Sequence, residues 1–263
     1  MLINIVGLPR TGTTYLYKVI FRGCHKLDHL NKFNTDLITW DEPWIINRKN
    51  FNLLETTDNF NKKIDIFNQS DLVVVKNHYD HLADLAVKFP DIYKQFFSKE
   101  TYTIKIFRRS LLSTVISNIL LNEFRSEPYL SKDRDSNGQR YLIRKINIDA
   151  EHFARVYEIY GYDHVRMYYN PLNLKIDEFV LYEQLETTSS AAWSSLDISK
   201  LEKFKYVMPA NETDDMLYEH KNYKKADLIE NYEDLVKIAK TKNVDHGNLR
   251  IENGNIYMKG IDF

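Results

Sequence analysis

Three short apolar segments break an otherwise mixed pattern of polar and hydrophobic positions, and each predicts a β-strand. They are Leu2–Val6, Asp71–Lys76 and Thr101–Phe107. The middle segment carries three consecutive valines with no polar alternation, which is typical of a strand buried on both faces of a parallel sheet. A fourth strand is predicted at Glu178–Tyr182, where the residues are again apolar and aromatic.

Helical periodicity follows or separates these strands. From Thr13 onward, Leu16, Val19 and Ile20 share one helical face, and Gly23 is a plausible C-cap. Further helices are predicted at 59–67, 81–89, 111–124 and 149–160. Alternating strands and helices, with lengths that allow crossovers, predict an α/β fold with a doubly wound, mostly parallel sheet flanked by helices. We expect one domain over residues 1–263.

The remaining segments have weaker patterns. Residues 40–44 (Trp-Asp-Glu-Pro-Trp) predict a turn, and the polar stretch 125–140 predicts a surface loop or a mobile lid. Beyond residue 187 we expect helices near 199–206 and 226–240, followed by an irregular tail.

The composition of the chain argues against several classes of function. The chain has 263 residues, 43% of them hydrophobic and 28% charged, and a formal net charge of −1. A protein that binds nucleic acid by neutralising its backbone is usually far more basic, so we expect no nucleic-acid partner. One cysteine, Cys24, cannot form an intramolecular disulfide. No apolar run is long enough to span a membrane and no signal peptide is evident, so we expect a cytoplasmic protein. The sequence leaves its oligomeric state open.

The segment between the first strand and the first helix has the spacing of a phosphate-binding loop. Its residues are Gly7-Leu8-Pro9-Arg10-Thr11-Gly12-Thr13-Thr14. Backbone N–H groups and the helix dipole favour an anion at such a place, and threonine hydroxyls add donors. A nucleoside-triphosphate loop carries lysine directly after its second glycine, but here that position is Thr13, and the cation is Arg10. The sequence therefore predicts a P-loop-type fold with chemistry other than that of a typical ATPase.

This loop resembles the 5′-phosphosulfate loop of the sulfotransferases that use 3′-phosphoadenosine 5′-phosphosulfate (PAPS). The matching stretch runs from Pro9 through Arg10, Thr11, Gly12, Thr13 and Thr14 to Tyr15, with Tyr15 standing where tryptophan is common. The resemblance implies that residues 10–14 hold the 5′-phosphosulfate and that Tyr15 packs against the adenine. It covers residues 1–120, the donor-binding half, well, and thins over 121–263.

The family also carries a 3′-phosphate segment, in which a strand ends in arginine and a serine follows in the next helix. Here Arg109 follows the third strand and Ser117 lies eight positions beyond it. The usual Asp or Asn and Pro are replaced by Ser110 and Leu111, and Arg108 allows a register shifted by one. Arginine grips a phosphate through two parallel hydrogen bonds, and serine donates another.

Two late segments also resemble family signatures. Residues 180–185 are similar to a strand that ends in Tyr-Glu-Asp-Leu, whereas the literal Tyr-Glu-Asp-Leu at 232–235 lies in a helical pattern and is discounted. Lys259 and Gly260 resemble the end of a late Arg-Lys-Gly that closes the 3′-phosphate site in the family.

The cytosolic branch of the family has Lys-x-His at the end of a middle strand, and here it reads Lys76-Asn77-His78. Residues two apart on a strand share a face, and the carboxyl ends of parallel strands meet at the edge where ligands bind. The resemblance implies that His78 is the general base and that Arg10, helped by Lys76, stabilises the leaving phosphate. Other branches use a glutamate, which makes Glu42 the alternative base, although its position also fits a simple turn.

The resulting hypothesis is transfer of a sulfuryl group from PAPS to a hydroxyl or amine of a small molecule or glycan, without a metal. Two alternatives stay open: a P-loop nucleotide kinase or NTPase, and a non-catalytic nucleotide-binding protein of the same fold. A zinc site from Cys24, His25 and His29 lacks a fourth ligand and is set aside. The acceptor itself is not encoded in any recognisable segment.

Overall fold

The computed structural model describes the chain at residues 2–14, 16–17, 20, 37–45, 52–70, 72–123, 130–134, 140–142, 144–169, 171–183 and 225–259. The chain divides into two compact units. The first comprises residues 1–107 and 170–210, and the second comprises 108–169 and 211–263. The predicted single domain stays a prediction, and the two units are described one at a time.

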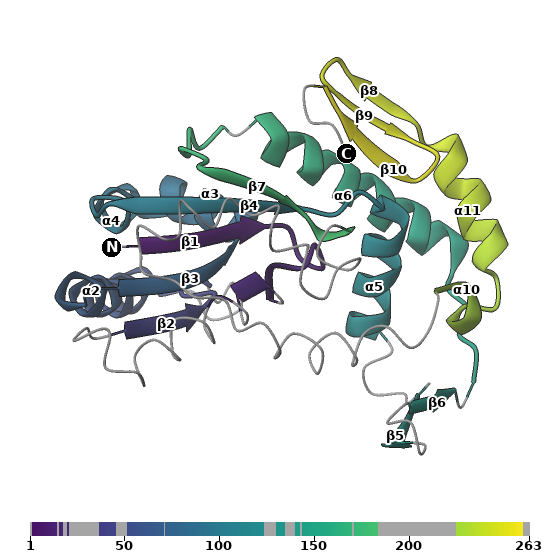
Figure 1. The fold of residues 1–263 in the computed structure, drawn as a ribbon, viewed down its shortest axis with the longest axis horizontal. Helices are drawn as coiled ribbons and strands as arrows, with labels where there is room; N and C mark the ends of the chain where they lie inside the picture. Colours follow the sequence, from purple (N-terminus) through teal and green to yellow (C-terminus); the bar gives the residue numbers. More distant parts are fainter. Residues whose placement is uncertain are drawn as a thin grey trace. The chain divides into compact units, whose positions relative to one another are not determined.

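The first unit contains a five-stranded sheet in which every neighbouring pair is parallel (Figure 1). Its spatial order is β2-β3-β1-β4-β7. The bounds are β1 Leu2–Gly7, β2 Leu37–Asp41, β3 Leu72–His78, β4 Thr101–Phe107 and β7 Glu178–Leu181. The three central strands are buried almost throughout, as uninterrupted apolar strands of a parallel sheet should be. The predicted α/β class, with a parallel sheet flanked by helices, is confirmed.

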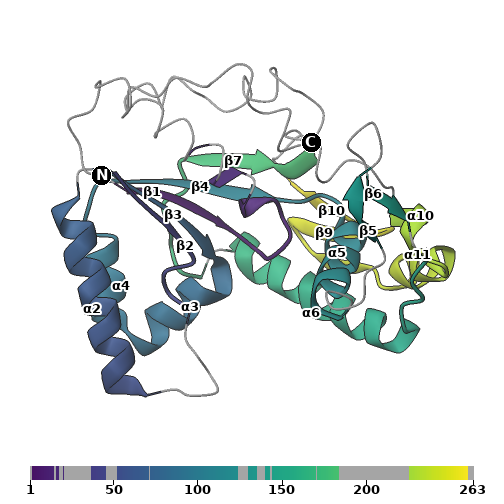
Figure 2. The same cartoon turned by 90° about the horizontal axis from the view of Figure 1, so that it is seen from below.

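Three helices of this unit lie on the same face of the sheet (Figure 2). They are α2 Leu53–Gln69, α3 Tyr79–Lys88 and α4 Pro90–Phe96. Trp44 is fully buried among their aromatic side chains, with ring centroids 5.3 Å from Phe60, 5.7 Å from Phe67 and 5.0 Å from Phe96. This packing anchors the segment that directly follows β2 and so positions the residues at its start.

The turn predicted at 40–44 is only partly correct. Trp40 and Asp41 complete β2, a strand missing from the sequence-based assignment, and the turn begins at Glu42. The strand is short and stands at the edge of the sheet, which explains its weak apolar signal. The helices predicted at 59–67 and 81–89 are confirmed as α2 and α3, with earlier starts.

The second unit contains α5 Leu111–Glu123 and α6 Ala150–Tyr169, followed by α10 Lys225–Leu228 and α11 Tyr232–Thr241. Both helices predicted at 111–124 and 149–160 are present, and α6 continues past its expected end. Within this continuation Gly161 leaves room for Ile251, because a Cβ at that position would lie 3.2 Å from Ile251 Cδ1. The helix predicted near 226–240 is present as α10 and α11, whereas 199–206 lies outside the described residues.

Two other predictions for this half were wrong. The expected irregular tail forms an antiparallel sheet of β8 Val244–His246, β9 Leu249–Glu252 and β10 Asn255–Met258. The polar stretch 125–140 contains β5 Leu130–Arg134 and the start of β6 Arg140–Leu142, rather than loop alone. Both sheets are built from very short strands, whose polar residues resemble a loop in the sequence.

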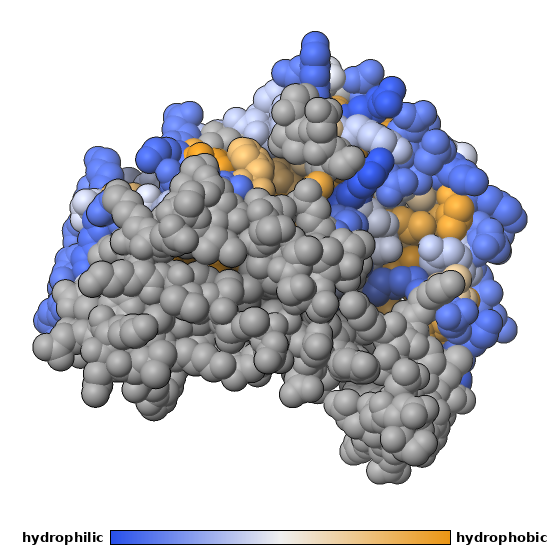
Figure 3. Space-filling model, in the orientation of Figure 1, coloured by the Kyte–Doolittle hydropathy of each residue, from blue (hydrophilic) through white to orange (hydrophobic). Residues whose placement is uncertain are grey.

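One face of the molecule is drawn in Figure 3. The described residues visible in Figure 3 are mainly hydrophilic, with smaller hydrophobic areas between them. In the part of the chain that the structure describes, no helix is both long and apolar enough to cross a membrane.

Candidate active site

The glycine loop follows β1 at a switch point of the sheet. In the sheet, β2 and β3 lie on one side of β1, and β4 and β7 lie on the other. The chain leaves β1 toward β2 and leaves the neighbouring strand β4 toward β7, which is the opposite direction. Ligands of open α/β sheets bind outside the carboxyl ends of the strands at such a point. The loop predicted from its spacing therefore lies where the topology favours a ligand.

Hydrogen bonds fold the loop tightly onto the start of the helix. Thr11 donates to the carbonyl of Leu8 through both its hydroxyl (2.7 Å) and its backbone N–H (3.3 Å). Leu16 N–H donates to the carbonyl of Gly12 at 3.0 Å, which is the first bond of the helical ladder. The N–H groups of Thr13 and Thr14 precede this bond, in the turn whose N–H groups lack an intrahelical acceptor. Such groups are the donors that an anion at a helix start would use.

Both glycines of the loop are sterically required. A Cβ on Gly7 would lie 2.7 Å from Thr13 Cγ2 and 2.8 Å from Thr11 Oγ1. Gly12 has a φ of +94°, and its Cβ would lie 2.3 Å from Cδ2 of Tyr182. Arg10 also has a positive φ, 66°, a conformation that non-glycine residues adopt rarely. Strained backbone of this kind is common where a loop is shaped to hold a ligand.

Strand register brings three chain segments to one level beside the loop. Gly7 at the end of β1 pairs with His78 at the end of β3, and Asp41 at the end of β2 pairs with Lys76. Glu42 follows Asp41, and its backbone N–H donates to the carbonyl of Lys76 at 2.8 Å. The convergence expected for the ends of these parallel strands is therefore present.

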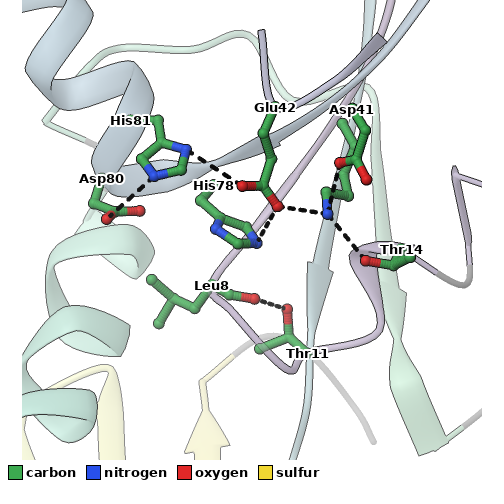
Figure 4. Close-up of polar contacts among 9 residues, drawn as sticks. Leu8, Thr11, Thr14, Asp41, Glu42, His78, Asp80 and His81 are labelled. Carbon is green, nitrogen blue, oxygen red and sulfur yellow. Dashed lines mark hydrogen bonds and ion pairs between the residues drawn. The ribbon is translucent and has the colours of Figure 1, made fainter. Parts of the chain in front are cut away.

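Lys76 joins the loop to the two carboxylates, and Figure 4 labels its three partners, Thr14, Asp41 and Glu42. Its Nζ lies 3.0 Å from Thr14 Oγ1, 2.7 Å from Asp41 Oδ1 and 2.6 Å from Glu42 Oε1. The lysine side chain is only 4% exposed. An ammonium group has three N–H donors, and these three oxygens match that number. These contacts hold Glu42 against the start of the helix. From the sequence, Lys76 was expected only to help Arg10 stabilise the leaving phosphate.

A second set of contacts links Glu42 to two histidines. His78 Nε2 lies 3.3 Å from Glu42 Oε1, and His81 Nδ1 lies 4.0 Å from Glu42 Oε2. The two imidazole rings have centroids 5.2 Å apart. On the far side of its ring, His81 Nε2 lies 4.0 Å from Asp80 Oδ2. Lys76 and His78 thus approach the same carboxylate oxygen, as residues on one strand face should.

The environment sets the charge of these groups. Burial raises the pKa of the Glu42 carboxyl, but the hydrogen bond from Lys76 and the nearby positive charges outweigh this, so its pKa lies below the ordinary value. Burial lowers the pKa of His78 to about 4, with Glu42 opposing the shift and Lys76 adding to it. At neutral pH Glu42 is therefore a carboxylate and His78 is an uncharged imidazole.

The other residues predicted for the donor fall into two groups. Tyr15 and Gly260 lie outside the described residues. Arg109, Ser117 and Lys259 belong to the second unit. There the Arg109 guanidinium lies 5.4 Å from the centroid of the Tyr257 ring, and its carbonyl accepts from Ile256 N–H at 2.8 Å. Ser117 is buried in α5, and Lys259 is exposed. Their role toward a 3′-phosphate stays a prediction.

Sequence reasoning missed three members of the cluster: Asp41, Asp80 and His81. A local signal did exist for the last, because His78 and His81 are three residues apart at the start of a predicted helix. Glu42 was named as the alternative base, but a turn was the preferred interpretation. Its φ of 53° does mark a turn, and its side chain also reaches Lys76 and His78.

No protein-family model matches this chain, and no curated protein matches its sequence. The structure shows an α/β fold with a five-stranded parallel sheet flanked by helices and a small antiparallel sheet. The family resemblance rests on the residues of the loop and of the strand ends.

Proposed function

We propose that this protein is a sulfotransferase that moves a sulfuryl group from PAPS to an acceptor hydroxyl or amine. One observation carries the proposal. The glycine loop and an acid–base cluster meet at the same edge of the sheet, joined by the 3.0 Å contact between Lys76 Nζ and Thr14 Oγ1. Group transfer from an anionic donor requires both parts within reach of one reacting atom.

The proposed chemistry is a single displacement. The acceptor oxygen or nitrogen attacks sulfur, the bond between sulfur and the bridging phosphate oxygen breaks, and adenosine 3′,5′-bisphosphate leaves with the electron pair. His78 removes the acceptor proton, and Glu42, 3.3 Å from its Nε2, stabilises the imidazolium that forms. Glu42 itself is the alternative base, because it is anionic and occupies the same cluster.

Charge on the departing phosphate is stabilised by the loop. Residues 10–14 supply backbone N–H groups at a helix start, and Arg10 supplies a cation within the loop. Lys76 reaches this anion only by exchanging one of its three oxygen partners, so its first role is to hold Glu42 and Thr14. The chemistry needs no metal, because amides and side-chain cations neutralise the charge.

The residue after the second glycine argues against the kinase alternative. A triphosphate loop has lysine there, reaching the β- and γ-phosphates, but Thr13 occupies the position and is only 2% exposed. A buried threonine cannot supply the missing charge. The fold alone does not separate the two activities, since one fold serves many reactions.

The deciding experiment is thermal unfolding of the full chain with adenosine 3′,5′-bisphosphate, 5′-AMP or Mg-ATP at equal concentration. A ligand present at a hundred times its Kd raises the free energy of unfolding by about 2.7 kcal/mol. In a chain of this size, that energy raises the midpoint by roughly 2–4 °C per kcal/mol. A rise with the bisphosphate that exceeds both other ligands supports the proposal. A rise with Mg-ATP alone would favour the kinase, and no rise with any ligand would contradict nucleotide binding.

A further inference from the structure

Three side chains around Glu42 have the composition of a metal site. Glu42 follows β2, His78 ends β3, and His81 lies in the first turn of α3, so three elements direct side chains to one point (Figure 4). Each residue offers one ligand atom, and these atoms lie within 4.8 Å of one another. The proposed sulfuryl transfer uses His78 and Glu42 but leaves His81 without a role.

His81 provides an independent indication that something is bound here. Its Nδ1 is buried and has no hydrogen-bond partner among the described residues, and the nearest carboxylate oxygen, Glu42 Oε2, is 4.0 Å away. Buried polar nitrogens are nearly always partnered in folded proteins. A proton on Nε2, the side that faces Asp80, would leave the Nδ1 lone pair directed at Glu42.

We infer that Glu42, His78 and His81 form a binding site for one divalent transition-metal ion. Zinc lies about 2.0–2.1 Å from nitrogen and carboxylate ligands, so neighbouring ligand atoms of a tetrahedral ion are roughly 3.3 Å apart. The ligand atoms of Glu42, His78 and His81 lie within 4.8 Å of one another, so they must move closer together when an ion binds. Two imidazoles and one carboxylate suit zinc or cobalt, whereas magnesium and calcium prefer oxygen ligands alone.

The surrounding groups resemble the outer partners that usually orient metal ligands. Lys76 bonds Oε1 of Glu42 and leaves Oε2 directed toward His81. Asp80 stands behind the His81 ring, as carboxylates do behind many metal-bound histidines. The cluster contains three carboxylates, those of Asp41, Glu42 and Asp80, and one ammonium, that of Lys76, and this balance of charge favours a cation. The closeness of Lys76 opposes it, so we expect moderate rather than very tight binding.

Metal binding and the proposed acid–base role exclude each other. A neutral imidazole has one free lone pair, so an ion bound to one nitrogen of His78 leaves the proton on the other, and the ion also occupies one oxygen of Glu42. Neither residue can then accept the proton of the acceptor. This consequence rests on the proposed function, and it makes the metal an inhibitor of transfer. The binding site itself does not depend on that function.

The test is a titration of the full chain with Co²⁺, in a Cys24→Ser background that removes the only thiol. We expect visible absorption bands of nitrogen-coordinated cobalt that saturate at one ion per chain and are displaced by Zn²⁺ but not by Mg²⁺. His81→Ala should weaken binding at least tenfold. His152→Ala, which removes a histidine of α6, is the matched control and should bind as the parent does.

A second variant covers the case in which His81→Ala does not fold. Asp80→Asn keeps the shape of the side chain and should lower the affinity for Co²⁺ roughly tenfold, as loss of an outer partner does. Absence of the cobalt bands, or equal affinity in His81→Ala and in the parent, would overturn the inference. Metal is titrated without nucleotide, and bisphosphate binding is measured with a chelator present, so failure of one proposal is distinguishable from failure of the other.

Discussion

Lys76 Nζ lies 2.6 Å from Glu42 Oε1, and this ion pair joins the end of β3 to the residue after β2. The same ammonium contacts Thr14 and Asp41. Glu42 is thereby held in a conformation with φ of 53°, which is otherwise unfavourable for a glutamate. The pair therefore serves two purposes: it orders a strained turn, and it keeps the Glu42 carboxylate charged beside His78.

Removing the ammonium tests the first purpose. Lys76→Met should lower the free energy of unfolding by about 1–3 kcal/mol, because it leaves two neighbouring carboxylates without their cation, although Asp41 is partly solvated. Urea unfolding measures this. The control is Lys88→Met, which removes a partly exposed pair with Asp84 and should lower the free energy of unfolding by less than about 1 kcal/mol. Equal losses in the two variants would show that the cluster adds no more stability than a pair on the surface.

The loop glycine gives a second prediction with a matched control. Gly12→Ala and Gly247→Ala both place a Cβ at positive φ, +94° and +71°, but only the former also meets a neighbour, Tyr182. Each should lose about 1 kcal/mol of stability from backbone strain alone. Only Gly12→Ala should weaken bisphosphate binding, by roughly tenfold or about 1.4 kcal/mol, because the loop must shift. Calorimetric titration of both variants with the bisphosphate measures this. Equal affinities in the two variants would show that the loop does not bind the bisphosphate.

The sequence predicted the central sheet well because its strands are buried on both faces. Val73, Val74 and Val75 are all fully buried, so their apolar run is undiluted by solvent-facing residues. The three short strands β8, β9 and β10 gave no such signal, and their region was predicted to be irregular. One local cue was present: Asn253 and Gly254 both have positive φ, 52° and 79°, and Asn-Gly between two short strands is a strong hairpin signal.

The candidate site was predictable only in part, for a different reason. The spacing of the loop and of Lys76 and His78 is local, and so the sequence displays it. Asp41 and Glu42 join them through the pairing of β2 with β3, in which Asp41 stands opposite Lys76. Register between strands that are distant in the sequence depends on tertiary packing, and a single sequence does not reveal it. The sequence therefore showed Asp41 only as part of a turn, and Glu42 as an alternative base whose preferred interpretation was the same turn.

The base can be assigned by comparing two substitutions. If His78 accepts the proton, His78→Ala should reduce turnover of labelled PAPS with a responsive acceptor by about 10²–10⁴-fold, the usual contribution of a general base. Bisphosphate affinity should stay nearly unchanged, since the donor loop is intact. Glu42→Gln should then reduce turnover less, because it removes only the charge that stabilises the imidazolium. The reverse order would make Glu42 the base, and a parallel loss of donor binding would point to damage of the site as a whole.

A buried histidine of the second unit should make stability depend on pH. His164 is fully buried in α6, and its Nδ1 lies 2.8 Å from the carbonyl of Tyr160, where a neutral ring donates. Burial lowers the pKa of His164 from 6.5 to about 4, with the hydrogen bond to Tyr160 opposing the shift. The unfolded chain therefore binds this proton more readily than the folded chain, and acid favours unfolding. The contribution is fully present above pH 6.5 and is lost as the pH falls toward 4.

His164→Asn isolates that contribution, because an asparagine side chain retains an N–H donor near the Tyr160 carbonyl and does not titrate. We expect the free energy of unfolding of the parent protein to fall more steeply between pH 6.5 and 4 than that of the variant. Urea unfolding at several pH values measures both slopes. Parallel slopes would mean that His164 keeps the same proton affinity when the chain unfolds, and the burial of His164 would then make no contribution to acid sensitivity.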